Sequence, residues 1–257
     1  MSFALKRKLP QIYKILKKFE KYVPAEVYLW DKKKYSANLK IVSLLSIWQS
    51  WPRLKTESKV VYDFYTGGDF LDIGAFQGVY AFILAPKAKK NDTFILCEPD
   101  MSVKKELLDN IRILKNLFKY VNFKHIFEPI GNGNKVVRNP TIYGHPKFES
   151  KDTFNNKNNS TESFNSITLD ELVKINKISP TFIKIDVEGA EYNVLNGMKN
   201  IFETLKPIIM LEKHPTLLPK NVNIGSINSL LHQNGYEMVK EIYKDDVAIT
   251  EIWKNSN

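Results

Sequence analysis

The sequence contains a single cysteine, Cys97, among its 257 residues. One cysteine cannot build a disulfide framework, and residues 94–97 form an apolar run in which a thiol packs as a small hydrophobic side chain. We therefore expect a protein of a reducing compartment, without a redox role for this thiol.

Long hydrophobic runs are also lacking. The apolar residues 41–48 fall far short of the ~20 residues that a membrane-spanning helix needs. The first residues lead directly to Lys6, Arg7 and Lys8, without the apolar segment of an export signal. We expect a cytoplasmic protein, and a chain of this length suffices for one sizeable core.

Acidic residues are scarce in the first 60 positions, where 14 Lys and Arg stand against 4 Asp and Glu. Residues 11–23 place apolar side chains at helical spacing with lysines opposite, which predicts a basic amphipathic helix. We predict a basic helical N-terminal extension or cap at residues 1–60 and a catalytic domain at residues 61–257. The helix either packs on that domain or contacts an anionic membrane surface or acidic partner.

Short apolar runs alternate with helical patterns from residue 60 onward. Strands are predicted at 70–73, 93–97, 121–127, 135–138, 182–187, 207–212, 236–240 and 247–253. Helices are predicted at 79–85, at 103–118, from a capping box at Thr168, from near Gly189 and at 224–233. Residues 151–165 lack periodicity and are expected to form a loop. This alternation predicts an α/β fold with a mostly parallel sheet covered by helices on both faces.

The stretch FLDIGAFQGVY, residues 70–80, matches neither of the common phosphate-binding patterns. Its glycines follow a strand, and ligands of open α/β sheets bind beyond the carboxyl ends of the strands. Asp72 would repel a pyrophosphate but suits a ligand that carries an ammonium and a sulfonium. Glu98 ends the next strand, where a carboxylate can accept hydrogen bonds from both ribose hydroxyls. Together these features predict an S-adenosylmethionine site.

Several segments resemble the FkbM family of S-adenosylmethionine-dependent methyltransferases over about residues 68–215. They are FLDIGAFQGVYAFILA, FILCEPD, LLDNIRILKN, SITLDEL, and FIKIDVEGAEYNVLNGM followed by KPIIMLEKHP. The resemblance implies the class I methyltransferase fold, a Rossmann-like seven-stranded sheet in the order 3-2-1-4-5-7-6 with the last strand antiparallel. It also implies O-methylation of a hydroxyl on a sugar, glycan or natural product. The cofactor contacts that it implies are Asp72, Gly74, Ala75, Phe76, Gly78, Glu98 and Glu128.

Four ionisable residues end two further strands, Asp186 and Glu188 on one and Glu212 and His214 on the other. If those strands are neighbours, the four side chains gather beside the cofactor. We expect His214 to act as general base for a hydroxyl acceptor and Asp186 to orient that acceptor. Mg²⁺ held by these groups, in a way that resembles catechol-type methyltransferases, is a less favoured alternative. Glu191 is expected to stabilise the dipole of the following helix.

Three other functions stay open. The helix at residues 11–23 would suit an enzyme that methylates a lipid-linked glycan at a membrane surface. A nucleic-acid acceptor would explain the basic N-terminus, but we disfavour it because no N/D-P-P-Y/F turn and no zinc-ligand spacing are visible. A non-catalytic cofactor-binding module of the same fold is the third.

Overall fold

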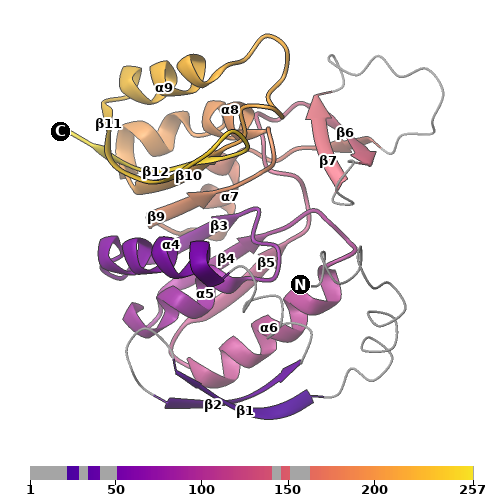
Figure 1. Cartoon of the computed structure of the whole chain (residues 1–257), viewed down its shortest axis with the longest axis vertical. Coiled ribbons are helices and arrows are strands. Elements are labelled where there is room, and N and C mark those ends of the chain that lie inside the picture. Colours follow the sequence, from indigo (N-terminus) through magenta and orange to yellow (C-terminus); the bar gives the residue numbers. More distant parts are fainter. Residues whose placement is uncertain (1–21, 29–33, 41–50, 141–145, 151–162, 257) are drawn as a thin grey trace.

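The computed structural model describes residues 22–28, 34–40, 51–140, 146–150 and 163–256 (Figure 1). Most of the helix predicted at residues 11–23 lies outside these residues. Its last two residues belong to strand β1 (Tyr22–Tyr28), which pairs antiparallel with β2 (Lys34–Lys40). This part of the extension is therefore a pair of strands, where we expected helix.

A seven-stranded sheet forms the centre of the molecule, in the order β11-β12-β10-β9-β3-β4-β5. Read from β5, this is the predicted order 3-2-1-4-5-7-6, and β12 lies antiparallel to β10 as expected. The strands are β3 (Asp69–Ile73), β4 (Thr93–Cys97), β5 (Asn122–Ile126), β9 (Pro180–Ile185), β10 (Ile208–Lys213), β11 (Tyr236–Lys244) and β12 (Ile249–Asn255). The predicted Rossmann-like fold is confirmed.

Helices cover both faces of this sheet because the buried strands alternate their side chains between two cores. Leu71 and Ile73 of β3 face a core with α7 (Leu169–Asn176), α8 (Glu191–Asn196) and α9 (Ile224–Gln233). Phe70 faces the other core, with α4 (Trp51–Phe64), α5 (Val79–Leu84) and α6 (Lys104–Leu117). Figure 1 shows these two sets of helices on opposite sides of the sheet.

Local sequence signals explain where several helices begin and end. The Thr168 side chain accepts a hydrogen bond from the Glu171 amide at the start of α7, and the Thr168 amide donates to the Glu171 carboxylate, which is the predicted capping box. Pro86 follows α5 within the short 3₁₀ turn η1 (Ala85–Lys87). Among the described residues, no helix is long and apolar enough to cross a membrane.

Two features differ from the predicted boundaries. Helix α4 runs across residue 60, where we placed the boundary between the extension and the main domain, and it buries Val61 and Glu57. Strand β6 (Lys135–Pro140) pairs with β7 (Pro146–Ser150) and β8 (Ser163–Asn165) in a separate small sheet. Residues 163–165, the end of the loop predicted at 151–165, are thus a strand. The other residues of that loop lie outside the residues that the structure describes.

Candidate functional site

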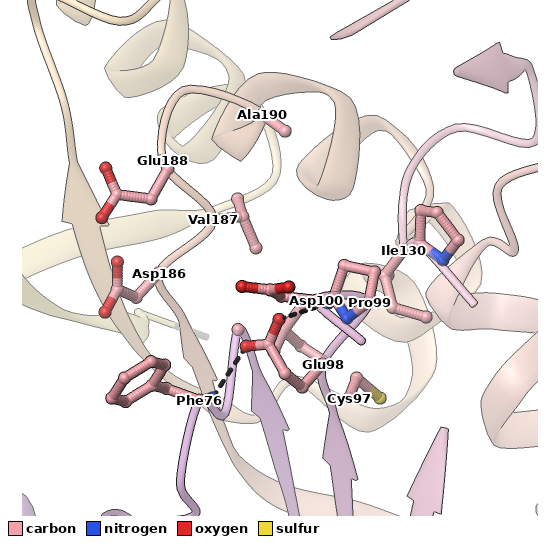
Figure 2. Close-up of a pocket in the computed structure, with 13 residues that line it drawn as sticks. Phe76, Cys97, Glu98, Pro99, Asp100, Ile130, Asp186, Val187, Glu188 and Ala190 are labelled. Atoms are coloured by element: carbon pink, nitrogen blue, oxygen red, sulfur yellow. Dashed lines mark hydrogen bonds between the residues drawn. The ribbon is translucent and has the colours of Figure 1, made fainter. Parts of the chain in front are cut away.

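A cavity of about 310 Å³ opens at the carboxyl ends of β3, β4 and β9. Figure 2 shows Glu98 and Asp100 on one side of it and Asp186 and Glu188 on the other. Its position is the one expected for a ligand of an open α/β sheet, and its volume lies at the lower end of small-molecule sites. The cavity is lined by Ile73, Gly74, Phe76, Cys97, Glu98, Pro99, Asp100, Pro129, Ile130, Asp186, Val187, Glu188 and Ala190.

The glycine turn after β3 brings two strand ends into close contact. Gly74 has φ +78°, and a Cβ atom on it would lie 1.7 Å from the carbonyl oxygen of Asp186. Only glycine fits this conformation and this approach. Gly78 also has a positive φ, and a Cβ atom there would lie 2.6 Å from Leu96, so it lets α5 pack closely on β4.

The carboxylate of Glu98 is buried and held by two backbone amides. Phe76 donates to its Oε2 and Asp100 donates to its Oε1, both at 2.8 Å (Figure 2). Burial raises the pKa of Glu98 to about 7, although the two amide hydrogen bonds act in the opposite direction. The two bonds fix the orientation of the carboxylate at the cavity wall, and its remaining lone pairs can accept from a ligand.

Only three of the seven predicted cofactor residues, namely Gly74, Phe76 and Glu98, line the cavity. Ala75 packs in the core and Gly78 serves the packing of α5. Glu128 is exposed, and its carboxylate accepts a hydrogen bond from the Phe127 amide. The next two residues, Pro129 and Ile130, line the cavity instead.

Asp72 lies beneath the glycine turn, buried and outside the cavity lining. It faces Lys184, the residue opposite it on β9, with 3.5 Å between Asp72 Oδ1 and Lys184 Nζ. Burial raises the pKa of Asp72, and the lysine partly offsets this. The charge of Asp72 therefore serves a buried ion pair, where we expected it to face the ligand.

Lys184 was missed by the sequence analysis. Its buried ammonium donates to the Gly74 carbonyl at 2.7 Å and lies 3.3 Å from Asp186 Oδ2. Burial alone would lower its pKa, but Asp186 and Asp72 raise it above its usual value, so the lysine is charged. The signal was a lysine in the apolar strand FIKI, at the position whose side chain points to the same face as Asp72.

The four predicted catalytic residues do meet, around His214. Its Nε2 lies 3.4 Å from Glu212 Oε1, 3.7 Å from Glu188 Oε2 and 3.8 Å from Asp186 Oδ1. Burial lowers its pKa, but the hydrogen bond with Glu191 and the nearby carboxylates of Glu212 and Asp186 outweigh this and raise it to about 11. These acids favour the protonated imidazole at neutral pH. This state argues against the general base that we expected.

Glu191 contributes more than the helix-dipole role that we expected of it. It is fully buried, and its Oε1 lies 2.8 Å from His214 Nδ1 and accepts from the Gly189 amide at 2.9 Å. Glu191 therefore sets the orientation of the imidazole.

The cavity fits a nucleoside cofactor, because a fixed carboxylate stands at the end of β4 and a tight turn that begins at Gly74 follows β3. Sheet order and site together define a class I methyltransferase. The methyltransferase FkbM domain model matches residues 72–238, and the chain belongs to this family. The chain therefore carries a methyltransferase domain, as the resemblance implied.

Solved structures of low sequence identity have a similar fold. The FkbM methyltransferase of Methylobacillus flagellatus is 18% identical, with a TM-score of 0.47, over 73% of this chain and 44% of that one. The chain thus spans less than half of that protein. The TrmK of M. capricolum, in complex with S-adenosyl-homocysteine, is 15% identical, with a TM-score of 0.43, over 80% of this chain and 68% of that one. No curated protein matches the sequence.

Proposed function

We propose that this enzyme transfers the methyl group of S-adenosylmethionine to a hydroxyl of a sugar, glycan or natural product. The observation that carries the proposal is the division of the cavity. Glu98 stands on one side, suited to ribose hydroxyls, and Asp186 and Glu188 stand on the other, suited to an acceptor hydroxyl (Figure 2).

Glu98 would hold the ribose, with Gly74 and Phe76 beside the methionine part of the cofactor and Ile130 beside the adenine. The cofactor supplies a methyl carbon that its sulfonium activates for displacement. The main task of the protein is then to align the acceptor oxygen with this carbon, and such alignment can contribute about 7–11 kcal/mol to the barrier reduction.

A hydroxyl acceptor must also lose its proton, and a carboxylate is better suited to accept it here than His214 is. Asp186 lines the cavity with its side chain 28% exposed, whereas the His214 side chain is 5% exposed and protonated. Partial burial and the neighbouring acids raise the pKa of Glu188, against the effect of His214, which makes it a second candidate. A base in position contributes roughly 10²–10⁴ in rate.

The test follows labelled methyl from S-adenosylmethionine into panels of sugars, glycans, amines, carboxylic acids and RNA. We expect incorporation only with hydroxyl acceptors, as an ether that withstands mild base. Asp186→Asn should lower the rate by about 10² or more while retaining cofactor affinity, since the lost group acts on the acceptor proton.

The exposed Glu237 lies on β11, outside the cavity lining, so Glu237→Gln is the matched control and should leave the rate unchanged. Incorporation into amines or RNA, or full activity in Asp186→Asn, would contradict the proposed acceptor chemistry.

A further inference from the structure

We propose that Asp186, Glu188 and His214 form a binding site for a divalent transition-metal ion, with Mn²⁺ as the representative. The site lies on the acceptor side of the cavity, so the ion would lower the pKa of the acceptor hydroxyl. This role rests on the proposed function, and a bound ion would take over from Asp186 the activation of the hydroxyl assigned to it there. Binding of the ion can be measured without any methyl transfer, so the two proposals can fail separately.

The distances around His214 suit a shared ion better than direct hydrogen bonds. One ligand atom from each of Asp186, Glu188 and His214 lies within 4.8 Å of the others. Nε2 lies 3.7 Å from Glu188 Oε2 and 3.8 Å from Asp186 Oδ1, longer than the roughly 2.7–2.9 Å of a charge-assisted hydrogen bond. Two tetrahedral ligands at about 2.1 Å from one ion are about 3.4 Å apart, so a small approach of these atoms would bring them to a common ion.

The imidazole is already oriented as a metal ligand. Glu191 lies 2.8 Å from Nδ1 and is itself held by the Gly189 amide, so Nε2 faces the carboxylates. Metal-bound histidines almost always donate their second ring nitrogen to such a partner, and here the partner is fully buried. A solvated ion-pair cluster would not need this second carboxylate behind the ring.

The side chains around His214 carry more negative than positive charge, which favours the binding of a cation. Four carboxylates, those of Asp186, Glu188, Glu191 and Glu212, surround His214, and the ammonium of Lys184 is shared between Asp186 and Asp72. The second oxygen of Glu191 is buried without a hydrogen-bond partner. Negative charge therefore exceeds positive charge, and a divalent ion at Nε2 in place of a proton would reduce the excess.

The backbone also directs Glu188 to this place. Glu188 has φ +52° and precedes Gly189, with φ +102°. A left-handed conformation is rare and strained in a residue other than glycine, and such strain concentrates at functional sites. The turn lets two residues that follow the same strand, Asp186 and Glu188, face one histidine.

The nature of the donors favours one group of metals. Mg²⁺ prefers an all-oxygen octahedral set, whereas imidazole suits zinc, iron and related ions, and carboxylates suit manganese. A set with one nitrogen and two or three carboxylates therefore points to Mn²⁺ or Zn²⁺, and not to the Mg²⁺ that the sequence suggested as an alternative.

The experiment titrates the full chain, freed of metal by a chelator, with Mn²⁺, and follows the free ion by electron paramagnetic resonance. We expect one ion per chain. Glu188→Gln should weaken binding at least about tenfold because it removes a charged ligand, and the substitution should leave folding intact because this side chain is half-exposed. His214→Gln should abolish binding, with circular dichroism as the check on folding, and Glu237→Gln should bind as the wild type does.

Absence of Mn²⁺ binding at ion concentrations up to about 1 mM would overturn the proposal, since such a site would be too weak to hold the ion. Equal affinity in the wild type and Glu188→Gln would overturn it as well, because the ion would then lie elsewhere. In either case an S-adenosylhomocysteine titration of the same samples reports separately on the cofactor site.

Discussion

Gly74→Ala is expected to lower the melting temperature by roughly 5–15 °C and to remove most of the cofactor affinity. The added Cβ would lie 1.7 Å from the Asp186 oxygen and 2.8 Å from its carbon, so the ends of β3 and β9 must separate. The left-handed conformation adds about 1–2 kcal/mol and the steric overlap about 1–3 kcal/mol. Thermal unfolding and S-adenosylhomocysteine titration measure the two effects.

Gly133→Ala provides the matched control for this variant. Gly133 also has a positive φ, +87°, but a Cβ atom there would lie at an ordinary 3.5 Å from Thr168 Cγ2. Gly133→Ala therefore has only the cost of placing alanine in a left-handed conformation. The difference in melting temperature between the two variants then measures the effect of the steric overlap between Gly74 and Asp186. Equal melting temperatures would contradict the tight contact between the two strand ends.

Lys184→Met is expected to destabilise the protein by about 3–5 kcal/mol, the usual cost of breaking a buried charge pair by removing one partner. Methionine retains most of the volume, so the loss reports on charge and hydrogen bonding. Asp72, Asp186 and the Gly74 carbonyl would all lose the ammonium that now faces them. Urea unfolding measures the loss.

A second substitution separates charge from packing. Asp72→Asn in the Lys184→Met background should recover part of the stability, because it removes the carboxylate left buried without a cation. The deficit of Lys184→Met should also shrink as the pH falls. Burial raises the pKa of Asp72 in the folded protein, and once the group is protonated in both folded and unfolded states its cost disappears. Wild-type stability in Lys184→Met would contradict this account.

Much of the fold could be predicted from the sequence because the buried strands and their helices carry strong periodic signals. The apolar runs of β3 and β9, the capping box at Thr168 and the glycines of the first turn all act locally. The sheet order, in contrast, came only from the family resemblance. The pair β1 and β2 was missed because our interpretation of the extension rested on the helical pattern of residues 11–23, and only the last two of these belong to β1.

The site was predicted less completely, for a physical reason. Strand ends indicate which residues gather at one edge of a sheet, and Glu98, Asp186 and Glu188 were found in this way. Spacing does not reveal which polar side chains pair beneath that edge. Asp72 was therefore assigned to the ligand, whereas it faces Lys184, and His214 was assigned as a base because spacing did not reveal that Glu191 contacts its ring.

The most direct test of the central claim, that the cavity beside Glu98 binds the cofactor, is calorimetric titration with S-adenosylhomocysteine. We predict one site per chain and a loss of about 1.5–3 kcal/mol in Glu98→Ala, the range for a lost hydrogen bond to a charged group. Glu128→Ala, which alters an exposed acid outside the cavity lining, should bind as the wild type does. No binding by the wild type, or equal affinity in Glu98→Ala, would contradict the account.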